Sequence, residues 1–520
     1  MRSMVKRGLR RDPPVTRFTR ATRRGDLYNT QNSSDPMTVQ ARASRFDVLR
    51  LPVIGNFLRW RYSRFVLQVP LFLLALLAVF DGFMGRQIAP VNVATVSVWV
   101  HYRGLVALAI AIVGNLFCAA CPLMLTRGPS KFLSQFIPKL EFPRALRNKY
   151  LVLGLTFLFL FCYELFDLWA SPFLTAWLII VYFAAALIVD SLFPAGTFCK
   201  YVCPLGNFNF ALAGASPTQI TAINSSVCTS CEGKYCLNGR EETATTRAPL
   251  FGNRSEHVLL ELPMAGASQG SFPGCETDLF VPTINSNTDC TLCLNCVRAC
   301  PYDNVALELR APTRESINTR PKADWALFIT VLTWAGLVNA FAMIPTFYSF
   351  ATTLSSFLGT RSEAVLLLLI QGVGIVAGVV ISSLAARLSG ATLRDYASIL
   401  LPMCLGIWGG HYLFHFITGY ATLLPNIVTA LQHLGLPLAD LPKPSIPRSD
   451  GIFLVQVVIT YVVLAASAYA AFQKARVYSN GNSRNLLLKL LPQIVVLLVI
   501  ATITLLIFSQ PMQARGSLLT

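Results

Sequence analysis

Long apolar stretches alternate along the chain with shorter polar segments. Each stretch is close to the roughly 20 residues that an α-helix needs to cross the hydrocarbon core of a bilayer. The pattern therefore predicts nine membrane-spanning helices, at about residues 65–85, 104–124, 150–170, 173–193, 325–349, 364–386, 396–418, 451–472 and 486–508.

The composition points to the same class of protein. Hydrophobic residues make up 54% of the 520 and charged residues only 13%, whereas soluble proteins carry about 25% charged residues. Each predicted span is also free of long charged runs. We therefore expect an all-α integral membrane protein.

Lysine and arginine are concentrated on one side of the predicted spans. The first 64 residues carry fifteen of them against four aspartates, and the loop 125–149 carries six. Basic loops mark the cytoplasmic side of a membrane protein, so we expect the N-terminus and the long loop 194–324 in the cytoplasm. This bias accounts for the net charge of +18 without a nucleic-acid partner. The expected location is a bacterial inner membrane.

One run of cysteines in that loop has a specific spacing. In DCTLCLNCVRACP, Cys290, Cys293, Cys296 and Cys300 follow C-x2-C-x2-C-x3-C-P. Bacterial ferredoxins use this run for [4Fe–4S] clusters, and its fourth cysteine ligates the neighbouring cluster. A zinc knuckle or disulfides are the alternatives, but zinc ribbons separate their cysteine pairs by a dozen or more residues. The run therefore predicts an iron–sulfur site.

The remaining cysteines of the loop extend this prediction to two clusters. VCTSCEGKYC supplies Cys228, Cys231 and Cys236, and Cys300 would complete their cluster by ligand exchange. The other three cysteines of the run would hold the second cluster. Its fourth ligand would be Cys275, in FPGCETD, or a cysteine at the membrane edge.

Two further cysteine pairs follow predicted two-span hairpins. FCAACPL contains Cys118 and Cys121, and FCKYVCPLG contains Cys199 and Cys203. The two stretches look like an internal repeat, with each pair at the cytoplasmic surface. Together they offer four ligands for a third cluster. Structural thiols or a redox dithiol are the alternatives.

These motifs define the expected parts of the chain. A basic cytoplasmic tail with an interfacial segment would occupy residues 1–64, and a four-helix membrane region residues 65–193. A cytoplasmic ferredoxin-like (α+β) insert with [4Fe–4S] clusters would follow at 194–324. A five-helix membrane domain would complete the chain at 325–520.

The stretches FCKYVCPLGNFNF, PGCETDLFVP and DCTLCLNCVRACPYDNV resemble the membrane polyferredoxins, which include NapH-type, NosR-type and CcoG/FixG-type proteins. They look closest to the FesM-type branch. The resemblance covers roughly residues 45–310 and matches the last five spans only loosely. CTSCEGKYC departs from the regular ferredoxin run of this family.

The resemblance implies electron transfer between the cytoplasm and the membrane. A soluble donor such as ferredoxin or flavodoxin would dock on the insert, and the acceptor would be a quinone, a haem or a metal, or a respiratory complex that holds one. Two other functions stay open. The protein could reduce a metal such as copper for the maturation of a respiratory enzyme, or it could be a redox sensor.

Histidines are concentrated on the predicted outer side. His101 opens the second predicted span, and His411 and His415 lie in WGGHYLFHF within the seventh. The i, i+4 spacing puts the last two on one helix face, and ionisable residues inside a membrane are candidates for function. They could bind copper or another metal, contribute to a haem b or quinone site, or pack as polar residues in the bundle.

Overall fold

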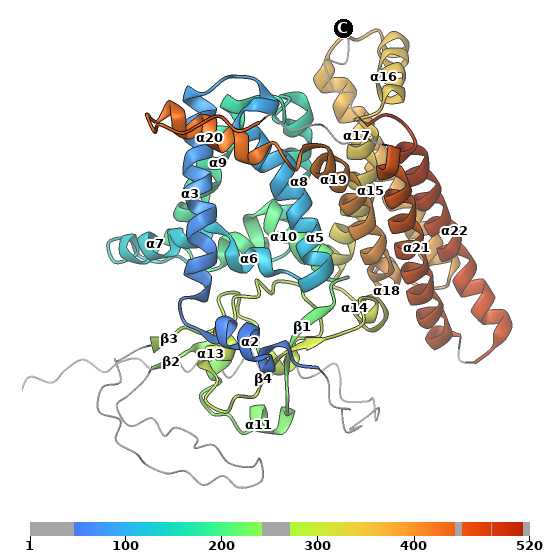
Figure 1. Cartoon of the computed structure of the whole chain (residues 1–520). Coiled ribbons are helices and arrows are strands. Elements are labelled where there is room, and N and C mark those ends of the chain that lie inside the picture. Colours follow the sequence, from blue (N-terminus) through green and yellow to red (C-terminus); the bar gives the residue numbers. More distant parts are fainter. Residues whose placement is uncertain (1–45, 242–270, 443–449, 480, 513–520) are drawn as a thin grey trace, which may run out of the picture. The chain divides into compact units, whose positions relative to one another are not determined.

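The computed structural model describes residues 46–241, 271–442, 450–479 and 481–512, which are mostly helical (Figure 1). Residues 1–45 of the expected basic tail lie outside this range. Eight of the described helices are long and apolar enough to cross a membrane, as expected of a multi-pass membrane protein. They are α3 (Ser63–Met84), the run of α4 (Val93–Thr95), η3 (Val96–Tyr102) and α5 (Arg103–Val113), α9 (Pro172–Leu192), α15 (Ala323–Phe341), α17 (Glu363–Leu388), the run of α18 (Leu393–Tyr396), η8 (Ala397–Leu400) and α19 (Leu401–Gly419), α21 (Asp450–Tyr478) and α22 (Ser483–Phe508).

The second membrane helix lies earlier in the chain than the expected range 104–124. It begins at Val93 and ends at Val113. Gly114 terminates it, because this residue has a left-handed φ of 87° and its N–H caps the carbonyls of Ala109 and Ile110. Glycine adopts this conformation without steric cost.

The span expected at 150–170 is a shorter helix, α8 (Tyr150–Leu165), of 16 residues. Asp167 follows it with a φ of 43°, which an α-helix cannot contain. Eight helices rather than nine therefore meet the length of a full span within the described residues. α8 is apolar nonetheless and packs against α15 and α17.

Shorter elements connect and extend these helices. The helices are α2 (Pro52–Arg59), α6 (Leu116–Ala120), α7 (Arg127–Leu133), α10 (Pro204–Ala213), α11 (Ser225–Thr229), α12 (Tyr235–Asn238), α13 (Asn295–Ala299), α14 (Arg314–Asn318), α16 (Pro345–Leu358) and α20 (Leu423–His433). The strands are β1 (Thr218–Ala222), β2 (Arg240–Glu241), β3 (Ser271–Phe272) and β4 (Val305–Leu309).

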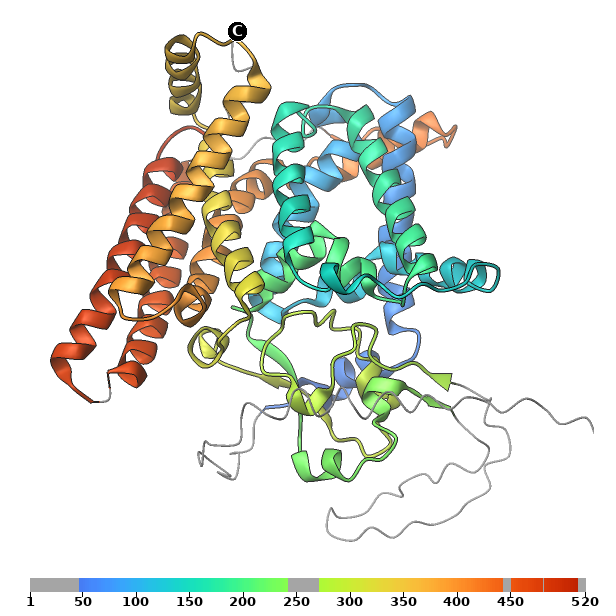
Figure 2. The same ribbon diagram turned by 180° about the vertical axis from the view of Figure 1, so that it is seen from behind.

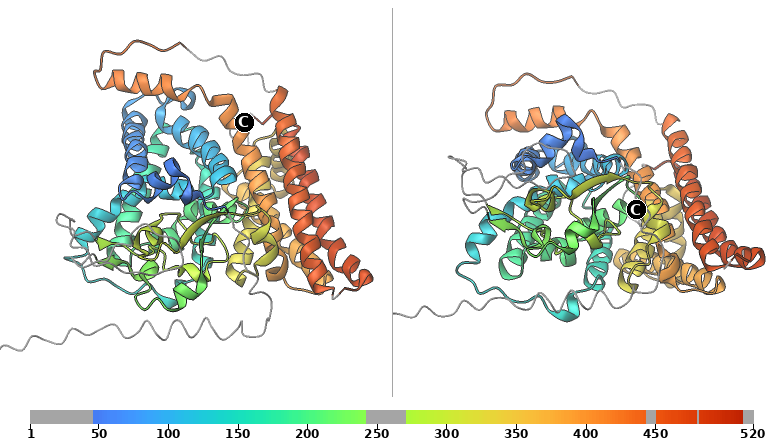
Figure 3. Two further views of the ribbon diagram at one scale, coloured as in Figure 1. Left: turned by 60° about the horizontal axis from the view of Figure 1, so that its bottom comes forward. Right: turned by 90° about the horizontal axis from the view of Figure 1, so that it is seen from below.

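The long helices pack mainly through apolar side chains. α21 and α22 lie side by side in both opposite views (Figures 1 and 2), and α19 packs against α5, α15 and α21. The largest buried cluster includes Trp408, Phe328 and Phe210. α20 contacts α3 near the end of the bundle that lies away from the strands (Figure 3).

The cysteine-rich segment, residues 194–241 and 271–322, contains all four strands. β1 pairs with β4 and β2 with β3, each antiparallel. The chain before α3 joins this segment, because the carboxylate of Asp47 accepts hydrogen bonds from the N–H groups of Leu307, in β4, and Leu49. Within the described residues, the only sheets are these two short ladders. A ferredoxin-like fold for the segment stays a prediction.

Candidate functional site

Cysteine thiols form the candidate site. All fourteen cysteines of the chain lie in the described residues, and none forms a disulfide. We sort twelve of them into three sets of four, and the members of one set line a common cavity. We call these the exposed group (Cys228, Cys231, Cys236 and Cys300), the central group (Cys275, Cys290, Cys293 and Cys296) and the helix-end group (Cys118, Cys121, Cys199 and Cys203).

The exposed group brings together two distant stretches of the sequence. α11 and α12 carry Cys228 and Cys236, and Cys300 directly follows α13. Burial raises the pKa of the Cys236 thiol to about 11, and the nearby thiols of the group add to this rise. Asn304 Nδ2 donates a hydrogen bond of 3.2 Å to Cys228 Sγ. Three of the four thiols are only half-buried.

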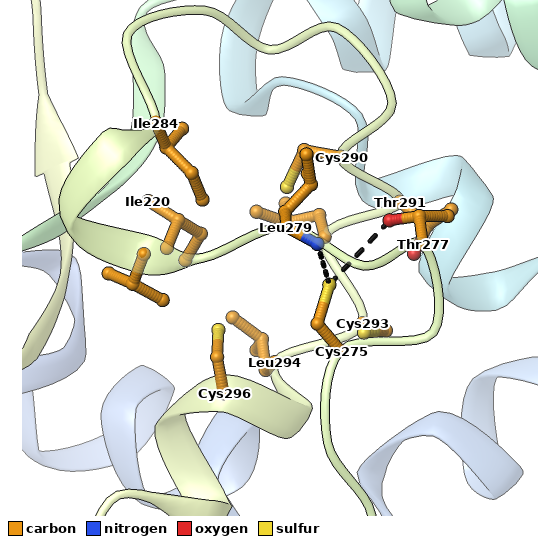
Figure 4. A pocket seen from close by; sticks show the side chains of 12 residues that line it. Ile220, Cys275, Thr277, Leu279, Ile284, Cys290, Thr291, Cys293, Leu294 and Cys296 are labelled. Carbon is orange, nitrogen blue, oxygen red and sulfur yellow. Dashed lines mark hydrogen bonds between the residues drawn. The ribbon is translucent and has the colours of Figure 1, made fainter. Parts of the chain in front are cut away.

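The central group surrounds a small cavity of about 20 Å³ (Figure 4). All four of its cysteines line this cavity, together with apolar residues that include Ile220 and Leu279. The N–H of Leu279 donates to Cys275 Sγ at 3.3 Å. Burial raises the pKa of Cys290 to about 12, because the thiolate is disfavoured away from water.

The central run, residues 289–296, turns sharply in the two-residue gaps between its cysteines. Asp289, Leu292 and Leu294 have φ values of 63°, 49° and 59°. Left-handed residues turn a chain sharply, although they cost non-glycine residues roughly 1–2 kcal/mol each. A left-handed leucine in each gap curls the run.

The helix-end group follows the ends of two membrane helices. Cys118 lies on α6, and Cys199 lies on a π-helical turn, η6 (Phe198–Val202). Cys203 caps α10 and accepts a hydrogen bond of 3.2 Å from the N–H of Gly206. Asn209 Nδ2 lies 3.8 Å from Cys118 Sγ. The two Cys-Pro stretches of the expected repeat therefore meet at one place.

The three groups are connected in series. The N–H of Cys275, in the central group, donates to the carbonyl of Cys236, in the exposed group, at 3.0 Å. On its other side, the central group receives a hydrogen bond of 3.0 Å from Asn115 Nδ2 to the Cys290 carbonyl. Asn115 directly precedes α6, which carries Cys118. The central group thus lies between the other two.

A buried lysine joins the central run to the membrane helices. Lys149, at the start of α8, places its Nζ 2.5 Å from Asp289 Oδ1 and 2.7 Å from both Asn207 Oδ1 and the Lys200 carbonyl. Burial lowers the pKa of Lys149, and Asp289 opposes this effect. This side chain fixes the run next to the segment that carries Cys199 and Cys203.

The structure shows which of the predicted cysteines lie together. Cys300 lies near Cys228 and Cys236, and Cys275 rather than a membrane-edge cysteine lines the cavity of the central group. Two further residues could not be singled out from the sequence. Lys149 is indistinguishable from the other lysines of a basic loop, and the only signal of Glu276 is its position directly after Cys275.

The three histidines that the sequence singled out lie on helices, His101 on η3 and His411 and His415 on α19. His101 has both ring nitrogens near backbone carbonyls, with Nδ1 3.1 Å from Val96 O and Nε2 3.0 Å from Tyr420 O. The rings of His411 and His415 are 5.4 Å apart, and His415 Nε2 lies 3.3 Å from Met343 Sδ. The rings of His411 and His415 are therefore neighbours, whereas His101 contacts two backbone carbonyls.

Among the residues that the structure describes, no group of three or more His, Cys, Asp or Glu side chains is arranged to hold a single metal ion. A single zinc ion would need four sulfurs at about 2.3 Å from one point.

Comparison of the chain with family models, with curated proteins and with solved structures found no match.

Proposed function

We propose that this chain is a membrane-bound electron-transfer protein that carries [4Fe–4S] clusters on its exposed and central groups, with a third on the helix-end group. The observation that supports it most is the cavity that four free cysteines of the central group line together. Four thiolates per cluster is the usual ligand count, and a bound cluster accepts and releases one electron at a time.

The surroundings of the thiols suit clusters better than zinc. The four thiols of the central group line one cavity, and the four cysteines of a [4Fe–4S] site likewise surround the cluster instead of converging on one ion. Hydrogen bonds to the sulfurs tune such sites. Here Leu279 N–H, Gly206 N–H and Asn304 Nδ2 supply them.

The position of each group suggests a direction of transfer. The exposed group is the most accessible to a partner, and the side chain of Tyr302 beside it is 53% exposed. A soluble donor such as ferredoxin or flavodoxin would dock there. The helix-end group follows membrane helices and would face an acceptor in the bilayer, which is a quinone, a haem or a respiratory complex that holds one.

The location and family belong to the same proposal. The lysine and arginine bias of the loops favours a cytoplasmic cysteine-rich segment, and we propose the bacterial inner membrane as the location. The resemblance of the cysteine stretches to the membrane polyferredoxins supports an electron-transfer role as well.

A second candidate function is reduction of copper for the maturation of a respiratory enzyme. The contact between His415 Nε2 and Met343 Sδ favours it, because imidazole and thioether are ligands that Cu(I) accepts. Copper binding that is lost in Met343→Leu and His415→Ala would support this candidate. Its absence would leave electron transfer to a membrane acceptor.

Anaerobic purification in detergent tests the main proposal. We expect iron and acid-labile sulfide at four each per intact group, and electron paramagnetic resonance (EPR) signals of reduced [4Fe–4S] clusters. The matched variants are Cys296→Ser, in the central group, and Cys404→Ser, on α19 outside the three groups. Iron loss only in the first fits the proposal. Zinc in place of iron in the purified protein would contradict it.

A further inference from the structure

Glu276 forms a buried charge bridge directly beside the central group. It follows Cys275 in the sequence and pairs with Arg64, at the start of α3, at 2.8 Å. It also pairs with Arg127, at the start of α7. The three side chains are only 13%, 17% and 16% exposed, respectively. Buried charges are costly unless they are paired, so the three residues hold one another in place.

One end of this bridge reaches the helix-end group. Arg127 lies 3.6 Å from Asp190, near the end of α9. Asp190 Oδ1 in turn accepts a hydrogen bond of 3.2 Å from the N–H of Phe198, the residue directly before Cys199.

The other end reaches the central group. Asn295 Nδ2, at the start of the helix that carries Cys296, lies 3.3 Å from Glu276 Oε1. The same charges therefore act on both groups. Charge interactions in a low-dielectric interior are stronger than in water.

We propose that Glu276, with Arg64 and Arg127, couples the central and helix-end groups electrostatically and sets the reduction potentials of the clusters that they hold. This inference rests on the proposed function. The two arginines stabilise an added electron at either group, and Glu276 moderates their effect. Glu276 acts through the cysteine sites as a positioning and tuning residue.

Potentiometric titration followed by EPR tests the proposal in the full-length protein. Glu276→Gln removes one negative charge between the groups, so the potentials of both sites should rise. We expect a tenfold change in the reduction equilibrium, which is 59 mV for a one-electron couple. The matched control is Glu308→Gln, which alters a buried carboxylate paired with Arg314 at 2.9 Å.

Variants of Arg127 should shift the reduction potentials in the opposite direction. Arg127→Gln removes a positive charge, so the potential of the helix-end site should fall, and fall more than that of the central site. Arg127→Lys keeps the charge and should stay close to the parent. A purely structural bridge would lose iron on substitution without shifts of opposite sign.

The outcomes separate this inference from the proposed function. Parent protein without iron would refute both. Full iron content with potentials unmoved by Glu276→Gln, or moved at one site alone, would refute the coupling and leave electron transfer intact. If Glu276→Gln fails to retain iron, the two Arg127 variants test the proposal instead. Unchanged potentials in Arg127→Gln would overturn it. A lower potential in Arg127→Gln that returns to the parental value in Arg127→Lys would support it.

Discussion

The ammonium group of Lys149 lies 2.5 Å from the carboxylate of Asp289, the residue directly before Cys290. Their side chains are 7% and 14% exposed. Because the same ammonium also bonds Asn207 and the Lys200 carbonyl, the pair connects the start of α8, the helix-end group and the central run.

This pair predicts a large effect on stability. Asp289→Asn leaves the charge of Lys149 buried without its partner, which should lower the free energy of unfolding by about 3 kcal/mol. Thermal unfolding in detergent measures the effect, and Lys149→Met combined with Asp289→Asn should cost less than the sum of the single changes. Glu141→Gln is the control, since Glu141 is 77% exposed in its pair with Arg147 and should cost under about 1 kcal/mol. Equal costs for the two pairs would contradict this interpretation.

The assignment of Cys300 to the exposed group predicts that different cysteine variants remove different EPR signals. Cys300→Ser should remove the EPR signal of the exposed group, because its thiol lies with Cys236 and Cys228. Cys293→Ser and Cys275→Ser should both remove the signal of the central group. Loss of one and the same signal in all three variants would show that the grouping is wrong.

The loop charges predict a cytoplasmic cysteine-rich segment. A green fluorescent protein fusion that ends at Arg320, before α15, should fluoresce. An alkaline phosphatase fusion that ends at Thr360, after α15 and α16, should be active, because that enzyme needs the periplasm to form its disulfides. The reverse pattern would invert the topology and exclude a cytoplasmic donor.

The paired histidines of α19 predict a change in the rate of reoxidation. If His411 and His415 contribute to the acceptor site, His411→Ala with His415→Ala should leave iron content intact and slow reoxidation of the reduced protein in membranes. Stopped-flow absorbance of the iron–sulfur chromophore follows this rate. Reoxidation at the parental rate would indicate that the acceptor binds elsewhere, near the helix-end group.

The thiol pKa values predict how cluster removal changes the response to pH. Burial raises the pKa of Cys121 and Cys236 from 9.0 to about 11, and that of Cys199 and Cys290 to about 12. In cluster-free protein, unfolded thiols lose protons above pH 9 while the buried thiols keep theirs. Stability should then fall as pH rises from 9 towards 11. Ligated thiolates do not titrate, so thermal unfolding of loaded protein should show a smaller fall between these pH values, and identical curves would contradict the prediction.

Sequence pattern predicted the membrane helices well because each is a long apolar run. It failed at helix ends, where single residues decide. Gly114 and Asp167 adopt left-handed conformations that no hydrophobicity pattern reveals. The span expected at 104–124 was therefore misplaced, and the one expected at 150–170 was too long.

The same limit applies to the candidate site. Regular spacing predicted that Cys290, Cys293 and Cys296 lie together, because short gaps make this a local property of the chain. The charge bridge could not be predicted, since Arg64 and Glu276 are 212 positions apart and only the folded chain brings them together. The place of Cys275 in the central group likewise depends on tertiary contacts.

The hydrogen bond between Asp47 and Leu307 spans 260 positions of the chain. A ribosome adds about 5–20 residues per second, so roughly 13–52 s separate the synthesis of its two ends. During that interval α3, α5 and α9 have already left the ribosome, whereas β4 has not been made. Synthesis of the first helices therefore precedes closure of the cysteine-rich segment, because its sheet and the contact with Asp47 both need β4.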